Sequence, residues 1–295
     1  MSTSHRSGLA LAFAAAAISG VAVYLNGFAV KVARDATIYT TAKNLIAGLV
    51  IVGFVMATRS AKPVRGGKQL ATLGLVALIG GSIPFVLFFE GLARASSVHA
   101  AFIHKTLFLW VAVLAIPLLG ERLRPVHGLA AAMLVGGLFV LEGGLTGFSI
   151  ATGEVLIFAA TLLWSAETVV VKRLLHDVAP ATVALARMAV GSLALVAWVI
   201  VTGRWHALVA LPVQGWLWAA ATGVILSCYV LTWFTALERA QALDVTAILV
   251  AGAVLTAVLR GGYVTVTAAT GLTLIAVGAV ITAFAAVQSR QPELT

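Results

Sequence analysis

Charged side chains are scarce in this sequence. Asp, Glu, Lys and Arg make up 10% of the 295 residues, whereas hydrophobic residues make up 61% and the mean hydropathy is +1.08. Soluble domains carry roughly 25% charged residues, so this composition excludes an ordinary water-soluble fold. The 19 Lys and Arg residues give a net charge of +9, but they are scattered among apolar runs. No continuous basic face results, and a nucleic-acid partner is not expected.

Cysteine is almost absent as well. Cys228 is the single cysteine, which excludes an intrachain disulfide and a cysteine metal cluster. His99 and His104 are five residues apart, a poor spacing for one helical face, so neither a metal site nor a cofactor is expected. The motifs GxSxG, HExxH, GxxxxGK[ST] and strand-linked GxGxxG are missing. We therefore do not expect an enzyme, and ATP-driven transport by this chain alone is not expected either.

Long apolar runs are what the sequence has instead. Runs of about 20 residues recur along the chain, enough to cross a bilayer as helices, and the alternating pattern of a membrane β-barrel is missing. The breaks between them predict an all-α integral membrane protein with ten transmembrane helices, near residues 8–30, 37–57, 69–90, 97–118, 124–141, 152–174, 181–201, 214–236, 244–259 and 267–287.

The distribution of Lys and Arg predicts the topology. With both termini in the cytoplasm, eleven of these residues fall on the inner side and five on the outer side. Positive charge concentrates on the cytoplasmic side of membrane proteins. We therefore expect a multi-pass protein of the cell inner membrane with cytoplasmic N- and C-termini, whose surroundings are the lipid bilayer.

The two halves of the chain resemble each other. FEGLARA at 89–95 matches FTALERA at 234–240 in four of seven positions, and Lys31 and Lys43 match Lys172 and Arg187. A five-helix unit crosses the membrane an odd number of times, so its second copy must enter from the opposite face. We expect two inverted repeats, residues 1–146 and 147–295, around a central cavity at their interface.

These features carry a resemblance to a known family. The five-helix repeat, the Lys that ends its first helix, the basic residue in its second helix and LLGERLRPVHGLAAAMLVGGLFVL at 118–141 resemble the EamA-type repeat of the drug/metabolite transporter (DMT) superfamily. The resemblance implies ten helices and export of metabolites. Within the superfamily the chain is similar to the YddG-type exporters of aromatic amino acids. The second copy departs from the pattern, because 260–272 holds no Glu in place of Glu121.

Polar residues inside apolar helices are the candidates for a substrate site, because a charge in the bilayer is costly unless it faces water or a partner. Lys105 and Glu167 are expected to face each other across the cavity, with His99 beside them. Aromatic side chains would form the apolar wall. The predicted substrate-binding set is Phe85, His99, Phe102, Lys105, Trp164, Glu167, Tyr229 and Trp233.

Other roles stay open for several of these residues. Lys105 could be a structural charge, the aromatic residues could pack against lipid, and Lys43 and Arg187 are expected to anchor to backbone carbonyls on opposite membrane sides. Glu121 is expected in an exposed ion pair with Arg122 and Arg124, where it could close a gate.

We expect a transporter that exports small amphipathic metabolites, foremost aromatic or large neutral amino acids, by alternating access. Either proton exchange through His99 or passive uniport would fit. One alternative is a carrier of phosphorylated metabolites or nucleotide-sugars, with Lys43, Lys105 and Arg187 around an anion. Another is a membrane-embedded lipid-handling enzyme. The sequence leaves the oligomeric state open.

Overall fold

The structure is a computed structural model that describes residues 3–33, 35–64, 66–95, 97–141, 150–261 and 265–288. These residues form helices joined by short connections, and no strand occurs among them. The helices are α1 (Thr3–Ala33), α2 (Ala36–Thr58), α3 (Gly67–Ile79), α4 (Ile83–Leu92), α5 (Ser97–Lys105), α6 (Leu107–Leu119), α7 (Pro125–Leu141), α8 (Thr152–Leu174), α9 (Pro180–Leu185), the π-helical turn η1 (Ala186–Val190), α10 (Gly191–Val201), α11 (Trp205–Val209), α12 (Val213–Arg239), α13 (Ala242–Leu249), α14 (Gly252–Arg260) and α15 (Val266–Gln288).

Every stretch that the sequence predicts as a span is largely helical. Within the described ranges, nine helical stretches are long and apolar enough to cross a membrane. α7 is a tenth apolar helix, but its 17 residues extend only about 26 Å at 1.5 Å per residue. The membrane protein class is therefore confirmed, and the ten-span count stays a prediction.

Several spans are broken in the middle. The third span divides into α3 and α4 at Gly80–Ser82, next to Pro84, whose ring lacks the N–H group that a continuous helix needs. The fourth span divides into α5 and α6 at Thr106, and the ninth into α13 and α14 at residues 250–251. The latter two breaks lie at matching places in the two halves of the chain.

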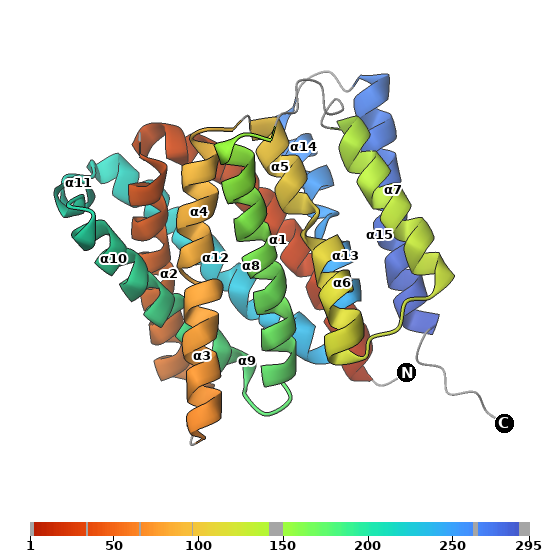
Figure 1. Cartoon of the computed structure of the whole chain (residues 1–295), viewed down its shortest axis with the longest axis horizontal. Helices are drawn as coiled ribbons and strands as arrows, with labels where there is room; N and C mark the ends of the chain where they lie inside the picture. Colours follow the sequence, from red (N-terminus) through yellow and green to blue (C-terminus); the bar gives the residue numbers. More distant parts are fainter. Residues whose placement is uncertain are drawn as a thin grey trace.

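The helices of the two halves pack against one another across the molecule. α1 lies along α12, α8 lies along α4, and α7 pairs with α15 (Figure 1). α7 and α15 come close enough for backbone contact, because a Cβ atom on Gly137 would lie 2.8 Å from the carbonyl oxygen of Gly271. Two ends of the bundle are distinguished below: the α9 end, where α1 begins and α15 finishes, and the α11 end opposite it.

Candidate functional site

A cavity of about 190 Å³ lies in the middle of the bundle between helices of both halves. Its walls come from α1, α2, α4, α5, α6, α8, η1, α12 and α13. The polar and aromatic side chains that line it are Ser19, Asn26, Lys43, Phe85, His104, Trp164, Glu167, Thr168, Arg187, Thr222, Tyr229 and Trp233. Of the eight residues predicted from the sequence, five are here: Phe85, Trp164, Glu167, Tyr229 and Trp233.

An ion pair between Glu167 and Arg187 lies at one wall of this cavity. The Arg187 Nε atom donates to Glu167 Oε1 at 2.6 Å, and both side chains are buried. Arg187 belongs to the π-helical turn η1, and Glu167 to α8. Gly80 makes room for the carboxylate, because a Cβ atom there would lie 2.1 Å from Glu167 Cδ. The expected Lys105–Glu167 pair is thus wrong, since Arg187 occupies that place.

Lys43 is the second basic residue of the cavity. Its Nζ atom lies over three aromatic rings, 5.5 Å from the centroid of Tyr39, 5.9 Å from Phe85 and 5.4 Å from Phe89. No carboxylate among the described residues pairs with it. Lys43 and Arg187 both line this one cavity, and the expectation that they face opposite membrane sides stays a prediction.

Aromatic rings form much of the remaining wall. The rings of Trp164 and Phe85 pack edge-on, with their centroids 5.3 Å apart. The Trp164 Nε1 atom donates a hydrogen bond to the carbonyl oxygen of Gly80 at 3.1 Å. That carbonyl is free for the bond because α3 ends at the preceding residue. Tyr229 and Trp233 are one turn apart on α12, and their rings stack with centroids 6.0 Å apart. The site therefore combines flat apolar surfaces with a cation and an ion pair.

The other three predicted residues lie elsewhere. His99 Nδ1 is 3.3 Å from Glu154 Oε1, outside the lining, and Phe102 packs in a cluster with Phe108 and Leu134. Lys105 borders an adjoining cavity of about 100 Å³. α5 finishes at Lys105, so the regular helical face assumed from His99 through Lys105 does not continue. His104, which also borders that cavity, faces the central site instead of His99.

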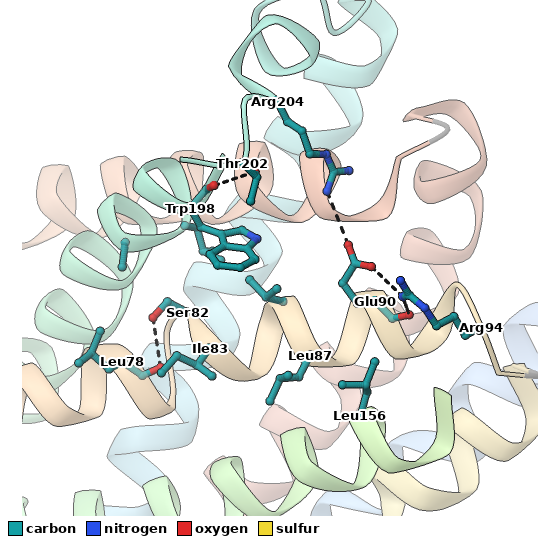
Figure 2. Close-up of a pocket in the computed structure, with 13 residues that line it drawn as sticks. Leu78, Ser82, Ile83, Leu87, Glu90, Arg94, Leu156, Trp198, Thr202 and Arg204 are labelled. Carbon is teal, nitrogen blue, oxygen red and sulfur yellow. Dashed lines mark hydrogen bonds and ion pairs between the residues drawn. The ribbon is translucent and has the colours of Figure 1, made fainter. Parts of the chain in front are cut away.

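A larger hollow of about 720 Å³ lies toward the α11 end, between α4, α8 and α10 (Figure 2). Its walls are mostly apolar, and Ile83 and Trp198 are exposed on the surface of membrane-spanning helices. The hollow is therefore a groove that opens sideways to lipid. We place the candidate site in the central cavity, where both halves of the chain contribute polar groups.

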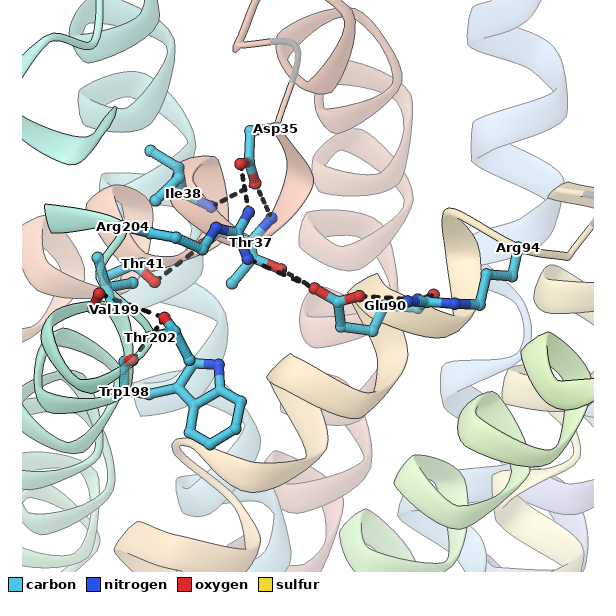
Figure 3. Close-up of polar contacts among 10 residues, drawn as sticks. All are labelled: Asp35, Thr37, Ile38, Thr41, Glu90, Arg94, Trp198, Val199, Thr202 and Arg204. Carbon is cyan, nitrogen blue, oxygen red and sulfur yellow. Dashed lines mark hydrogen bonds and ion pairs between the residues drawn. The ribbon is translucent and has the colours of Figure 1, made fainter. Parts of the chain in front are cut away.

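A network of charges lies at the α11 end (Figure 3). Arg204 pairs with Asp35 and lies 3.6 Å from Glu90, which also pairs with Arg94 at 2.7 Å and accepts a hydrogen bond from Thr37 at 3.1 Å. Asp35 also caps α2 by accepting from the backbone N–H groups of Thr37 and Ile38. The network ties the start of α2, the end of α4 and the segment before α11 together.

At the α9 end, two charged side chains bind backbone groups. Glu121 is buried and accepts hydrogen bonds from the N–H groups of Ala242 at 2.7 Å and Leu243 at 3.0 Å, where α13 begins. Lys172 donates to the carbonyl oxygens of Leu237 and Ala240, where α12 finishes. The expected exposed ion pair of Glu121 is wrong, because its carboxylate caps a helix. Burial raises the pKa of Glu121 above its ordinary value of 4.5, and the two N–H donors oppose this.

Comparison with known proteins agrees with this architecture. No curated protein matches the chain significantly. A solved crystal structure is similar over 95% of this chain and 99% of its own, with a TM-score of 0.75 and 22% sequence identity, a likeness that concerns the fold alone. The EamA-like transporter family profile matches twice, at residues 6–142 and 151–288. The chain therefore belongs to the EamA-like transporter family of the DMT superfamily, and it is a multi-pass membrane transporter.

Proposed function

We propose that this transporter exports small amphipathic metabolites that carry a carboxylate, foremost aromatic or large neutral amino acids, across the inner membrane. The observation that carries the proposal is Lys43, a buried ammonium among aromatic rings with no carboxylate partner in the described part of the chain. A substrate carboxylate would complete its charge. Trp164, Tyr229 and Trp233 would pack against a flat or large apolar side chain.

The ammonium of an amino acid has acceptors in the same cavity. Glu167 faces the cavity with its carboxylate shared with Arg187, and Asn26 and Thr168 add amide and hydroxyl groups. Lys43 and Arg187 supply two positive charges and Glu167 supplies one negative charge, so one positive charge of the cavity is left uncompensated. That balance suits a single carboxylate.

Alternating access would follow from two inverted repeats around this cavity. α1 and α8 are the first helices of the two halves, and α4 and α12 belong to their third spans. α1 packs on α12, and α8 packs on α4, so the first helix of each half contacts the third span of the other. This symmetry supports an internal two-fold relation between the halves. The charge network at the α11 end and the backbone contacts at the α9 end would then open in turn. We place the α9 end in the cytoplasm, because most Lys and Arg outside the spans lie there.

Uptake and efflux of labelled phenylalanine in proteoliposomes test the proposal. Lys43→Gln should raise KM about 10- to 100-fold, because a hydrogen bond to a charged group contributes about 1.5–3 kcal/mol. Lys68→Gln is the matched control, since Lys68 is exposed at the start of α3. An unchanged KM in Lys43→Gln would remove Lys43 from the substrate site.

A carrier of phosphorylated metabolites is the second candidate, because Lys43 and Arg187 line one cavity. Its distinguishing result is transport of a labelled sugar phosphate, but no amino acid, by folded protein. A phosphate carries two negative charges, whereas the site has one uncompensated positive charge. A phosphorylated substrate therefore fits the site less well than a carboxylate does.

A further inference from the structure

A buried acid that the central cavity does not use lies near the start of α13. Asp244 is fully buried, and neither of its carboxylate oxygens has a hydrogen-bond partner among the described residues. Buried carboxylates ordinarily accept hydrogen bonds, and this one accepts none from the described part of the chain.

His127, in the first turn of α7, faces this acid. Its Nδ1 atom accepts a hydrogen bond from the backbone N–H of Arg124 at 3.0 Å, so Nδ1 carries no proton and the neutral ring carries its proton on Nε2. Nε2 lies 3.4 Å from Asp244 Oδ1, close but without the geometry of a hydrogen bond. The backbone thus fixes the tautomer that points an N–H group at the acid.

The other charged groups around the pair do not neutralise Asp244. Glu121 caps the same helix and adds a second carboxylate, whose charge Lys172 partly balances. His5, on α1, contacts the backbone carbonyls of Arg239 and Ala286. The side chains of α6 and α15 near His127 are uncharged, among them Phe108, Ala112 and Thr282.

We propose that His127 and Asp244 form a proton-binding site that couples a proton to the transport cycle. A proton from water adds to a carboxylate oxygen of Asp244, which becomes a neutral acid, and it returns to water on release; no other bond forms or breaks. A cavity of about 40 Å³ borders His127, which is enough room for a water molecule.

The position of the pair connects the proton to the substrate site. α13 lines the central cavity through Leu249, and the break at residues 250–251 separates it from α14. This pair links α7 to α13, and residues Leu134, Leu138 and Ala247 of the same two helices belong to one apolar cluster beside it. Gaining or losing the proton changes the attraction between the two helices, and therefore the position of α13 at the cavity. This coupling rests on the proposed function, whereas proton binding itself does not.

Infrared difference spectroscopy of the purified protein tests proton binding without any substrate. When the pH is lowered stepwise, the difference spectra of the wild type should show the C=O stretch of a buried carboxylic acid. Asp244→Asn should lose this band and His127→Gln should shift it. Asp177→Asn and His176→Gln are matched controls, because both residues are exposed at the α9 end. An identical band in the wild type and in folded Asp244→Asn would overturn the proton site.

Transport in proteoliposomes tests the coupling. A pH gradient should drive accumulation of labelled phenylalanine by the wild type and by Asp177→Asn, and this accumulation should be lost in Asp244→Asn. Gradient-driven accumulation that persists in Asp244→Asn would overturn the coupling. If no variant or wild type moves phenylalanine but the Asp244 band is present, the substrate proposal fails and the proton site stands.

Discussion

Gly81 and Gly191 touch through their backbones where the α3–α4 break meets the start of α10. A Cβ atom on Gly191 would lie 2.7 Å from the Cα of Gly81, and one on Gly81 would lie 2.1 Å from the carbonyl oxygen of Arg187. We expect Gly191→Ala to destabilise the protein by about 1–3 kcal/mol, because the backbones must move apart. Thermal unfolding in detergent measures this.

The control for that prediction is Gly74→Ala. No atom lies within 4 Å of a Cβ built on Gly74, and the residue is inside α3, so the substitution should leave the melting temperature equal or slightly higher. Equal melting temperatures for Gly191→Ala and the wild type would show that the contact is loose.

At the residue scale, the sequence predicted well which residue types matter and less well which of them meet. The high energy of a charge in the bilayer identified Glu167, Lys43 and Arg187 as residues that need an explanation. Their partners could not be read from the sequence, because Arg187 reaches Glu167 from a π-helical turn, Ala186–Val190, whose own five residues include no Gly or Pro. The matched positions of Lys43 and Arg187 in the two halves were the signal that could have placed both at one site.

At the element scale, α13 depends on Glu121 for its cap. Glu121→Ala removes the acceptor for two N–H groups, and we expect it to lower stability by about 1.5–3 kcal/mol. Glu238→Ala is the control, since Glu238 is half-exposed and near the same end. An equal loss of stability in the two variants would argue against the cap.

The same carboxylate predicts a pH dependence. Because burial raises the pKa of Glu121, the folded state binds this proton more tightly than the unfolded chain does. Its contribution is fully present below the unfolded pKa of 4.5 and falls as the pH rises through the folded pKa. The difference in melting temperature between the wild type and Glu121→Ala should therefore become smaller as the pH rises from the acid side.

Breaks in the helices were only partly predictable. The division of the third span is indicated by Gly80, Gly81 and Pro84, because Pro lacks the N–H group that a continuous helix needs. The break at Thr106 has no such marker: Thr106 bonds its hydroxyl to the carbonyl oxygen of Ile103 at 2.6 Å. Missing this break gave α5 the wrong face and put His99 in place of His104.

At the scale of the whole molecule, Arg204 joins segments that are far apart in the sequence at the α11 end. We expect Arg204→Gln to shift the protein toward a form open at that end, because it removes the contacts with both Asp35 and Glu90. The reporter is a cysteine at Thr168 in the central cavity, with Cys228 replaced by Ser. Labelling by a membrane-impermeant thiol reagent from the α11 side should become several-fold faster.

Arg260→Gln serves as the control, because Arg260 is exposed at the same end and outside the network. An unchanged labelling rate in Arg204→Gln would mean that other contacts close this end.

The architecture of helices and the duplication were predictable from apolar runs and matched residues. The network was not, because it joins segments far apart in the chain.

The sideways groove between α4 and α10 has a pharmacological consequence. It holds about 720 Å³ and leads from the lipid-facing Trp198 to the charges of Glu90, Arg94 and Arg204. A lipid-soluble compound with a polar head group could reach it from within the bilayer and wedge the two helices in one arrangement. Such an inhibitor would act without competing with the substrate, so raising the metabolite concentration would not restore export.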